Sequence, residues 1–131
     1  MVFKPLIRVC IAVALCVSAL AIAPSSAQTD PASAGPVTVV VEVALAANTT
    51  PSEALAALND MRAMMKRQPG YVSEEFLQNL NASNAPRYLH VSRWASMSYW
   101  AALFRTPEFS KLSAHGNEHY SISASAFLPT E

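Results

Sequence analysis

Residues 50–70 specify a helix with a defined beginning and a defined end. The segment TPSE at 50–53 is a capping box, with a hydroxyl at the cap, proline in the first turn and Glu three residues after the cap. A basic pair at 66–67 stands where the helix dipole favours cations, and Pro69-Gly70 ends the pattern. Apolar side chains recur at helical spacing between these ends, at Leu55, Leu58, Met61 and Met65.

Extended segments surround this helix and a second helical region. Residues 37–47 are β-branched and almost continuously apolar, which favours a strand covered on both faces. Residues 71–80, 87–94 and 120–128 also have strand patterns, and the second helical region begins after Ser96 and restarts at 106–108. The order β-α-β-β-α-β predicts an α+β, ferredoxin-like fold, a four-stranded antiparallel sheet with two helices on one face.

One face of such a sheet stays without a helical cover. Its apolar side chains need another partner, and a second copy of the chain packed sheet against sheet is the simplest one. We therefore expect a homodimer.

The N-terminus has the three parts of a secretory signal. Lys4 precedes an apolar run over 6–23, and Arg8 lies near the start of that run. Small residues before Gln28 fit a cleavage site after Ala27. The alternative is a transmembrane anchor, but the uninterrupted run is shorter than the ~20 residues that span a bilayer. We predict a signal peptide at 1–27, a linker at 28–36 and a domain at 37–131, in a secreted or periplasmic protein with no stable membrane anchor.

Composition excludes several functions. The chain has 9 Lys+Arg and 9 Asp+Glu among 131 residues, a balance that does not suit a nucleic-acid partner. Only three glycines occur, at 35, 70 and 116, so neither a phosphate-binding loop nor a dinucleotide fingerprint is present. We expect no nucleotide cofactor.

The segment 87–94 places polar groups on one face of a strand. By alternation Tyr88, His90, Ser92 and Trp94 share that face. Buried polar groups need partners, and a pocket that holds ligand or water provides them. His90 titrates in the range that lets it accept a proton from a phenol or quinol near neutral pH, although a structural histidine is the simpler alternative.

The stretch RYLHVSRWASMSYWAALFRTPEF at 87–109 resembles the antibiotic-biosynthesis monooxygenase (ABM) family of dimeric α/β barrels. The features that carry the resemblance are a Trp at the end of a strand, a small helix cap, an aromatic helix residue and a Thr-Pro-x-Phe restart. Here they are Trp94, Ser96, Trp100 and residues 106–109, and the Pro69-Gly70-Tyr71 turn also fits. The resemblance covers about residues 36–129.

The resemblance implies a cofactor-independent monooxygenase that acts on an aromatic or quinol-like molecule with O2. We assign catalytic roles to His90, as the base, and to Trp94, as a wall against which the substrate stacks. The residues expected to bind substrate are Tyr88, Ser92, Trp100, Phe104 and His115. Many family members carry Glu at the position of Ser92, so this chain lacks a carboxylate that its relatives have.

The sequence also allows other functions. The same pocket could serve a non-catalytic, ligand-binding or stress-related dimer, and His115 could bind haem, although the first strand lacks the Asn that haem-degrading relatives carry. His115 and His119 have the spacing of two metal ligands on a helix, but Gly116 and Asn117 between them are poor helix formers. We therefore expect no metal site.

Overall fold

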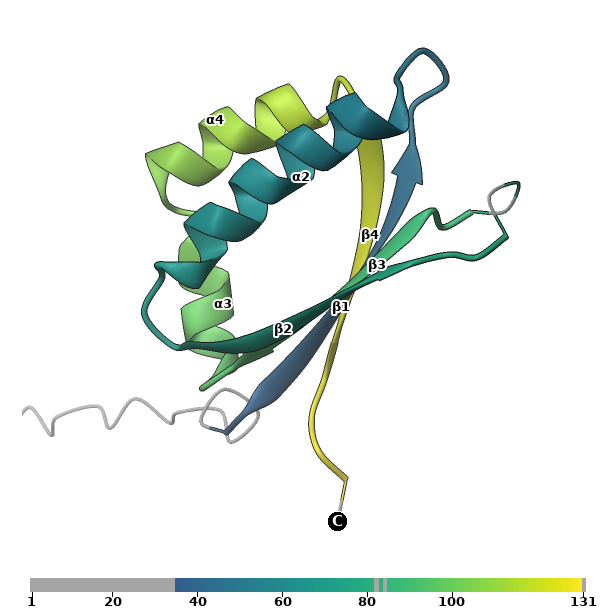
Figure 1. Ribbon diagram of the computed structural model, residues 1–131. Helices are drawn as coiled ribbons and strands as arrows, with labels where there is room; N and C mark the ends of the chain where they lie inside the picture. Colours follow the sequence, from purple (N-terminus) through teal and green to yellow (C-terminus); the bar gives the residue numbers. More distant parts are fainter. Residues whose placement is uncertain (1–34, 82, 84, 131) are drawn as a thin grey trace, which may run out of the picture.

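The computed structural model describes residues 35–81, 83 and 85–130 (Figure 1). The predicted signal peptide and most of the predicted linker lie outside this range. Within it the elements are β1 (Val37–Leu45), α2 (Pro51–Lys66), β2 (Tyr71–Gln78), β3 (Tyr88–Trp94), α3 (Met97–Leu103), α4 (Pro107–Gly116) and β4 (Tyr120–Phe127). None of the described helices is long and apolar enough to cross a membrane.

The four strands form one antiparallel sheet in the order β2-β3-β1-β4. This order and the β-α-β-β-α-β sequence of elements confirm the ferredoxin-like prediction. The helices lie on one face of the sheet, with α2 beside α4 and α3 near the end of β3 (Figure 1). The second helical region is thus two helices, because Thr106 caps a new helix at Pro107.

The capping box forms as the sequence predicts. Thr50 Oγ1 accepts a hydrogen bond from the backbone nitrogen of Glu53, and the Glu53 carboxylate accepts one of 2.8 Å from the backbone nitrogen of Thr50. After α2 the chain turns at Gly70, whose φ of 79° is a conformation that glycine adopts without strain. These two ends fix where the long helix begins and where β2 starts.

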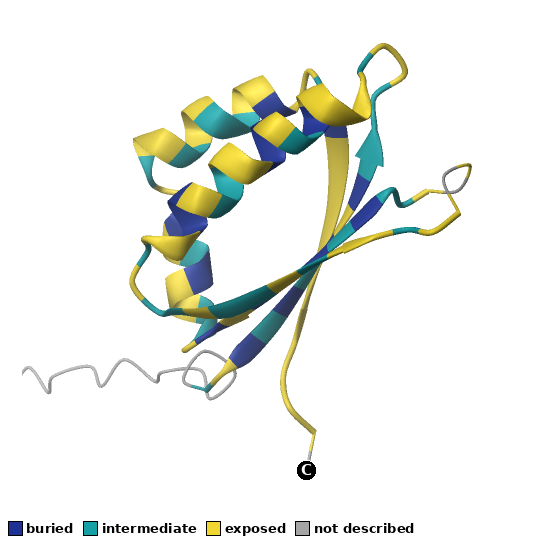
Figure 2. Ribbon diagram, in the orientation of Figure 1, coloured by how far each residue is buried: buried dark blue, intermediate teal, exposed yellow. Residues whose placement is uncertain are grey.

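The core lies between the helices and the central strands (Figure 2). Val39 and Val43 of β1 are fully buried, and so are Met64 of α2, Trp94 of β3 and Leu103 of α3. Alternation along β1 and β3 directs these strand residues toward the helices. The central strands therefore position the helix-facing side chains of β3.

No described element covers the opposite face of the sheet (Figure 1). Val40 and Val91, which are paired across β1 and β3, are half-buried there, and Leu77 and Phe127 are about half exposed. Glu42, the serines of β4 and other polar side chains interrupt this apolar surface. The face has the apolar centre that the homodimer prediction requires, and the dimer remains a prediction.

Candidate functional site

A cavity of about 90 Å³ lies between the helix layer and the middle of the sheet. Side chains from all seven elements or their ends form its wall, and most of them are apolar. The polar lining residues are Arg62, His90, Ser113, Asn117 and Tyr120. Phe104 and Ile122 also line it and are about half exposed, so the cavity opens to solvent beside them.

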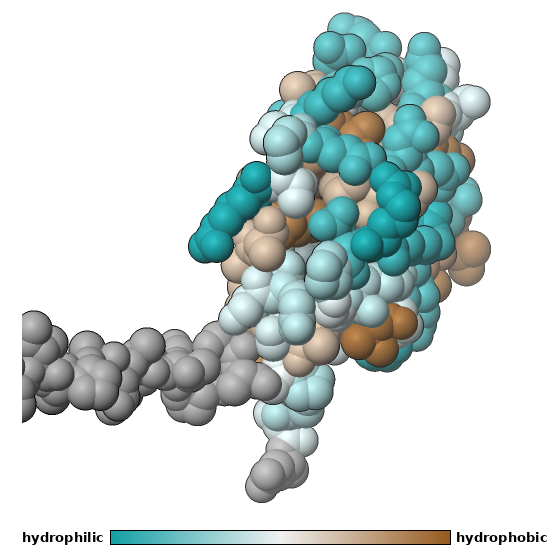
Figure 3. All heavy atoms as spheres, turned by 90° about the vertical axis from the view of Figure 1, so that its left-hand side faces the viewer, coloured by the Kyte–Doolittle hydropathy of each residue, from teal (hydrophilic) through white to brown (hydrophobic). Residues whose placement is uncertain are grey.

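Figure 3 views the helix side of the molecule. Hydrophilic side chains cover most of this face, and apolar groups are visible between them. The lining of the cavity is thus more apolar than this outer face.

The buried pair His90 and Glu74 is the main polar feature of the cavity. His90 is 5% exposed, and its Nε2 lies 2.7 Å from Oε2 of Glu74 on the adjacent strand β2. A carboxylate can only accept, so Nε2 carries the proton and Nδ1 is the ring nitrogen left for a molecule in the cavity. The arrangement fixes the tautomer and the orientation of the imidazole.

Two cations bind the other oxygen of the same carboxylate. Arg62 Nη2 lies 2.6 Å and Lys66 Nζ 2.7 Å from Oε1 of Glu74. Both come from α2, one helical turn apart, so the helix and the sheet meet through this carboxylate. The Arg62 guanidinium also lies over the ring of Phe76, 4.4 Å from its centroid.

The pKa values of the pair follow from burial and these contacts. Burial alone would raise the pKa of Glu74, but hydrogen bonds from Arg62, Lys66 and His90 outweigh it and hold the pKa at about 2. Burial lowers the pKa of His90 below its ordinary value, and the hydrogen bond to Glu74 opposes this only in part. At neutral pH the site therefore holds an ionised Glu74 and a neutral His90.

The side chains of Ser92 and Trp94 are joined by a hydrogen bond. Trp94 Nε1 donates to Ser92 Oγ at 3.0 Å, and both side chains are fully buried. Edge-to-face contacts with Tyr71 and Trp100 hold the indole of Trp94, and neither Ser92 nor Trp94 lines the cavity. Their predicted substrate contacts stay untested, and the structure shows them packed in the core.

The other predicted binding residues divide between the cavity and its surroundings. Trp100 and Phe104 line the cavity, with their rings 5.0 Å apart in an edge-to-face arrangement. Tyr88 is buried and stacks on Phe76, outside the cavity wall. His115 also lies outside that wall, and its side chain is 54% exposed.

The sequence prediction missed Glu74, although one feature of the sequence pointed to this residue. It shares the helix-facing side of β2 with Phe76, an unusual place for a charge. In the observed register Glu74 is the partner of Ser92, so the two side chains lie on the same face of the sheet.

The family model for antibiotic biosynthesis monooxygenase matches residues 36–114, and the chain belongs to this family. A search of curated proteins gave no match. Among solved structures, SnoaB of Streptomyces nogalater, a cofactor-independent oxygenase, has a TM-score of 0.66 at 18% identity, covering 75% of this chain and 96% of its own.

Two further structures share the fold at low identity. A dimeric ferredoxin-like protein of unknown function from Bacteroides fragilis has a TM-score of 0.56 at 16% identity, with 72% of this chain and 97% of its own covered. A Mycobacterium tuberculosis protein has a TM-score of 0.62 at 15% identity, with coverage of 74% and 97%. These likenesses establish a fold shared with an oxygenase and with a dimer.

Proposed function

We propose that this ABM-family protein is a cofactor-independent monooxygenase that oxidises an aromatic or quinol-like small molecule with O2. The observation that carries the proposal is the neutral, buried His90, bonded through Nε2 to Glu74 in an otherwise apolar cavity. Membership of the ABM family and the fold shared with a cofactor-independent oxygenase support the same reaction class.

His90 acts as the base in this scheme. Its Nδ1 accepts a proton from a substrate hydroxyl, and the ionised Glu74 offsets the positive charge that forms on the imidazole. In a cavity with few polar groups the substrate anion is poorly solvated, which raises its reactivity toward O2. Trp100 and Phe104 provide aromatic surface that orients a planar ring.

The oxidation needs no external reductant. A quinol and O2 give a hydroxyquinone and water: one oxygen atom joins a ring carbon, the other leaves as water with two hydrogens, and the quinol supplies all four electrons. The proton taken by His90 returns to the oxygen that leaves as water.

We also propose that the protein acts as an exported homodimer. The apolar centre of the uncovered sheet face, around Val40 and Val91, supports the association, and one structural relative is described as dimeric. The N-terminal sequence at 1–27 supports export.

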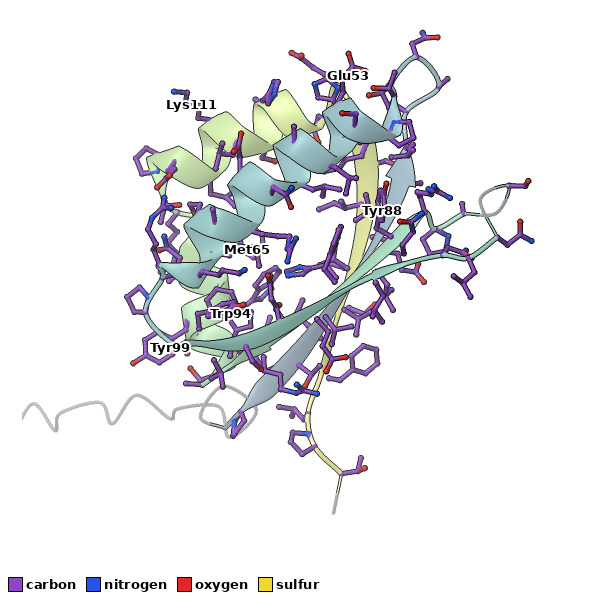
Figure 4. All side chains as sticks on the ribbon, in the orientation of Figure 1. Glu53, Met65, Tyr88, Trp94, Tyr99 and Lys111 are labelled. Carbon is purple, nitrogen blue, oxygen red and sulfur yellow. The ribbon has the colours of Figure 1, made fainter. Side chains whose placement is uncertain are left out.

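Oxygen uptake tests the reaction. Purified, metal-stripped protein is mixed with a panel of quinols and phenols, and an oxygen electrode records consumption. We expect a turnover that falls by roughly 10²–10⁴-fold in His90→Asn. Lys111→Ala, on the outer surface of α4 (Figure 4), is the control and should retain the full rate. A rate that His90→Asn leaves unchanged would remove His90 as the base.

A second candidate is ligand binding without turnover, which the largely apolar cavity wall favours. The same panel distinguishes the two: quenching of the tryptophan fluorescence by a quinol, with no oxygen uptake, supports binding alone. Oxygen uptake that depends on His90 supports the oxygenase.

A further inference from the structure

A second cluster of chemically active side chains lies outside the cavity, where α4 meets β4. His115, Glu118 and His119 each offer one ligand atom, and these atoms all lie within 4.8 Å of one another. His115 Nδ1 and Glu118 Oε2 are 3.9 Å apart, and the two imidazole rings are 5.0 Å apart between centroids. We propose that this cluster binds a divalent first-row transition metal ion, with Zn²⁺ as the reference ion.

The backbone explains how the cluster forms despite Gly116 and Asn117. After α4 the chain continues in tight i→i+3 turns, in which Glu118 N donates to His115 O and His119 N donates to Gly116 O. Residues three apart are eclipsed in such turns, so Glu118 is brought beside His115. The chain therefore winds more tightly than an α-helix after Gly116 and Asn117, and the three ligand side chains lie close together.

A hydrogen bond from another part of the chain orients one ligand. Thr49, in the loop between β1 and α2, has its Oγ1 3.0 Å from Nδ1 of His119. When Nδ1 donates to this hydroxyl, Nε2 keeps the lone pair that binds a metal. Partners of this kind are typical of metal-binding histidines, in which they fix the ring and the tautomer.

The donor set and the position select the class of ion. Two imidazoles and one carboxylate suit Zn²⁺, Cu²⁺ or Ni²⁺, whereas Mg²⁺ and Ca²⁺ prefer oxygen ligands. The side chains of His115 and Glu118 are 54% and 72% exposed, so rotations about their side-chain bonds can bring their ligand atoms to about 2.0–2.2 Å from a common ion. The C-terminal end of α4 adds a favourable negative potential for a cation.

Isothermal titration of Zn²⁺ and Mg²⁺ into tag-free protein tests the proposal. The expected result is one Zn²⁺ bound per chain, weakened by roughly tenfold or more in His115→Ala and in His119→Ala, with no heat from Mg²⁺. His90→Gln is a matched control, because His90 is the one histidine of the chain outside the cluster and is buried elsewhere. Zn²⁺ should also raise the Tm of the wild type and of His90→Gln, but not of the two ligand variants.

Thr49 provides a finer test. Thr49→Val removes the hydroxyl that orients His119 and should weaken Zn²⁺ binding by roughly tenfold, and Thr49→Ser should restore it. Equal Zn²⁺ affinity in the wild type, His115→Ala and His119→Ala would overturn the proposal, as would the absence of any Zn²⁺ heat in the wild type. Circular dichroism of each variant shows whether the fold is kept.

Discussion

Trp94 and His90 lie on the same helix-facing side of β3, four residues apart, and the structure gives them different surroundings. Trp94, near α3, is fully buried, with its nitrogen bonded to Ser92 (Figure 4). His90, where α2 and α4 span the middle of the sheet, lines a cavity and shares a buried charge network. The comparison shows that alternation decides which face of the sheet a residue is on, and that the packing of the helices above it decides whether the residue is enclosed in the core or lines a cavity.

Truncation of Trp94, at the packed end of β3, should have the largest effect on the free energy of unfolding. We expect Trp94→Ala to lower the free energy of unfolding by about 3–5 kcal/mol, because it removes a fully buried indole and leaves a void. Urea denaturation followed by circular dichroism measures the loss. A loss below about 1 kcal/mol would show that this end of β3 is not the packed core described here.

Removal of the Glu74 charge, beside His90 at the cavity, should have an intermediate effect on the free energy of unfolding, and this effect should depend on pH. Glu74→Gln should lower the free energy of unfolding by about 2 kcal/mol at neutral pH, since charge-assisted bonds to Arg62, Lys66 and His90 are weakened. The folded-state pKa of Glu74, about 2, is below its unfolded value of 4.5, so its contribution is present above pH 4.5 and is lost as the pH falls toward 2.

Denaturant titrations across this pH range check the prediction, with Glu75→Gln as a matched control. Glu75 is the next residue on β2, but it points to the other face, and its side chain is 57% exposed beside Arg93 at 3.6 Å. Its substitution should change the free energy of unfolding by less than about 0.5 kcal/mol. Equal effects of the two variants would contradict the buried network.

Truncation at the mouth of the cavity should have the smallest effect on stability. Phe104 is 47% exposed, so Phe104→Ala should cost about 1 kcal/mol, far less than Trp94→Ala, although both remove an aromatic ring. The variant should also widen the opening and weaken the binding of a planar quinol, measured by tryptophan fluorescence. A stability loss as large as that of Trp94→Ala would mean that Phe104 belongs to the core.

Much of the fold was accessible from the sequence because its signals are local. The capping box, the Pro-Gly stop and the β-branched run over 37–47 place β1 and α2 within a few residues of their observed bounds. Alternation in 87–94 also predicted the helix-facing side of β3. The division of the second helical region was indicated by Thr106 and Pro107, which act as a cap and a first-turn residue.

The site was less accessible because it depends on relations between distant segments. The hydrogen bond between Glu74 and His90 depends on the register of β2 against β3. This register shifts between Tyr71 and Ser73, and no local sequence pattern shows the shift. His115 was expected in the pocket, but Ser113 and Asn117, one turn apart, are the residues of that region that line it. At 100° per residue His115 points to the other side of α4.

The two-sided character of β3 has a consequence for how such a protein can change. Its even-numbered residues from Tyr88 to Trp94 face the helices, and the residues between them face the uncovered surface. Mutations at the first set alter the core and the cavity wall, while those at the second alter the uncovered surface of the sheet, so a single seven-residue strand lets the interior and that surface diverge separately between related sequences.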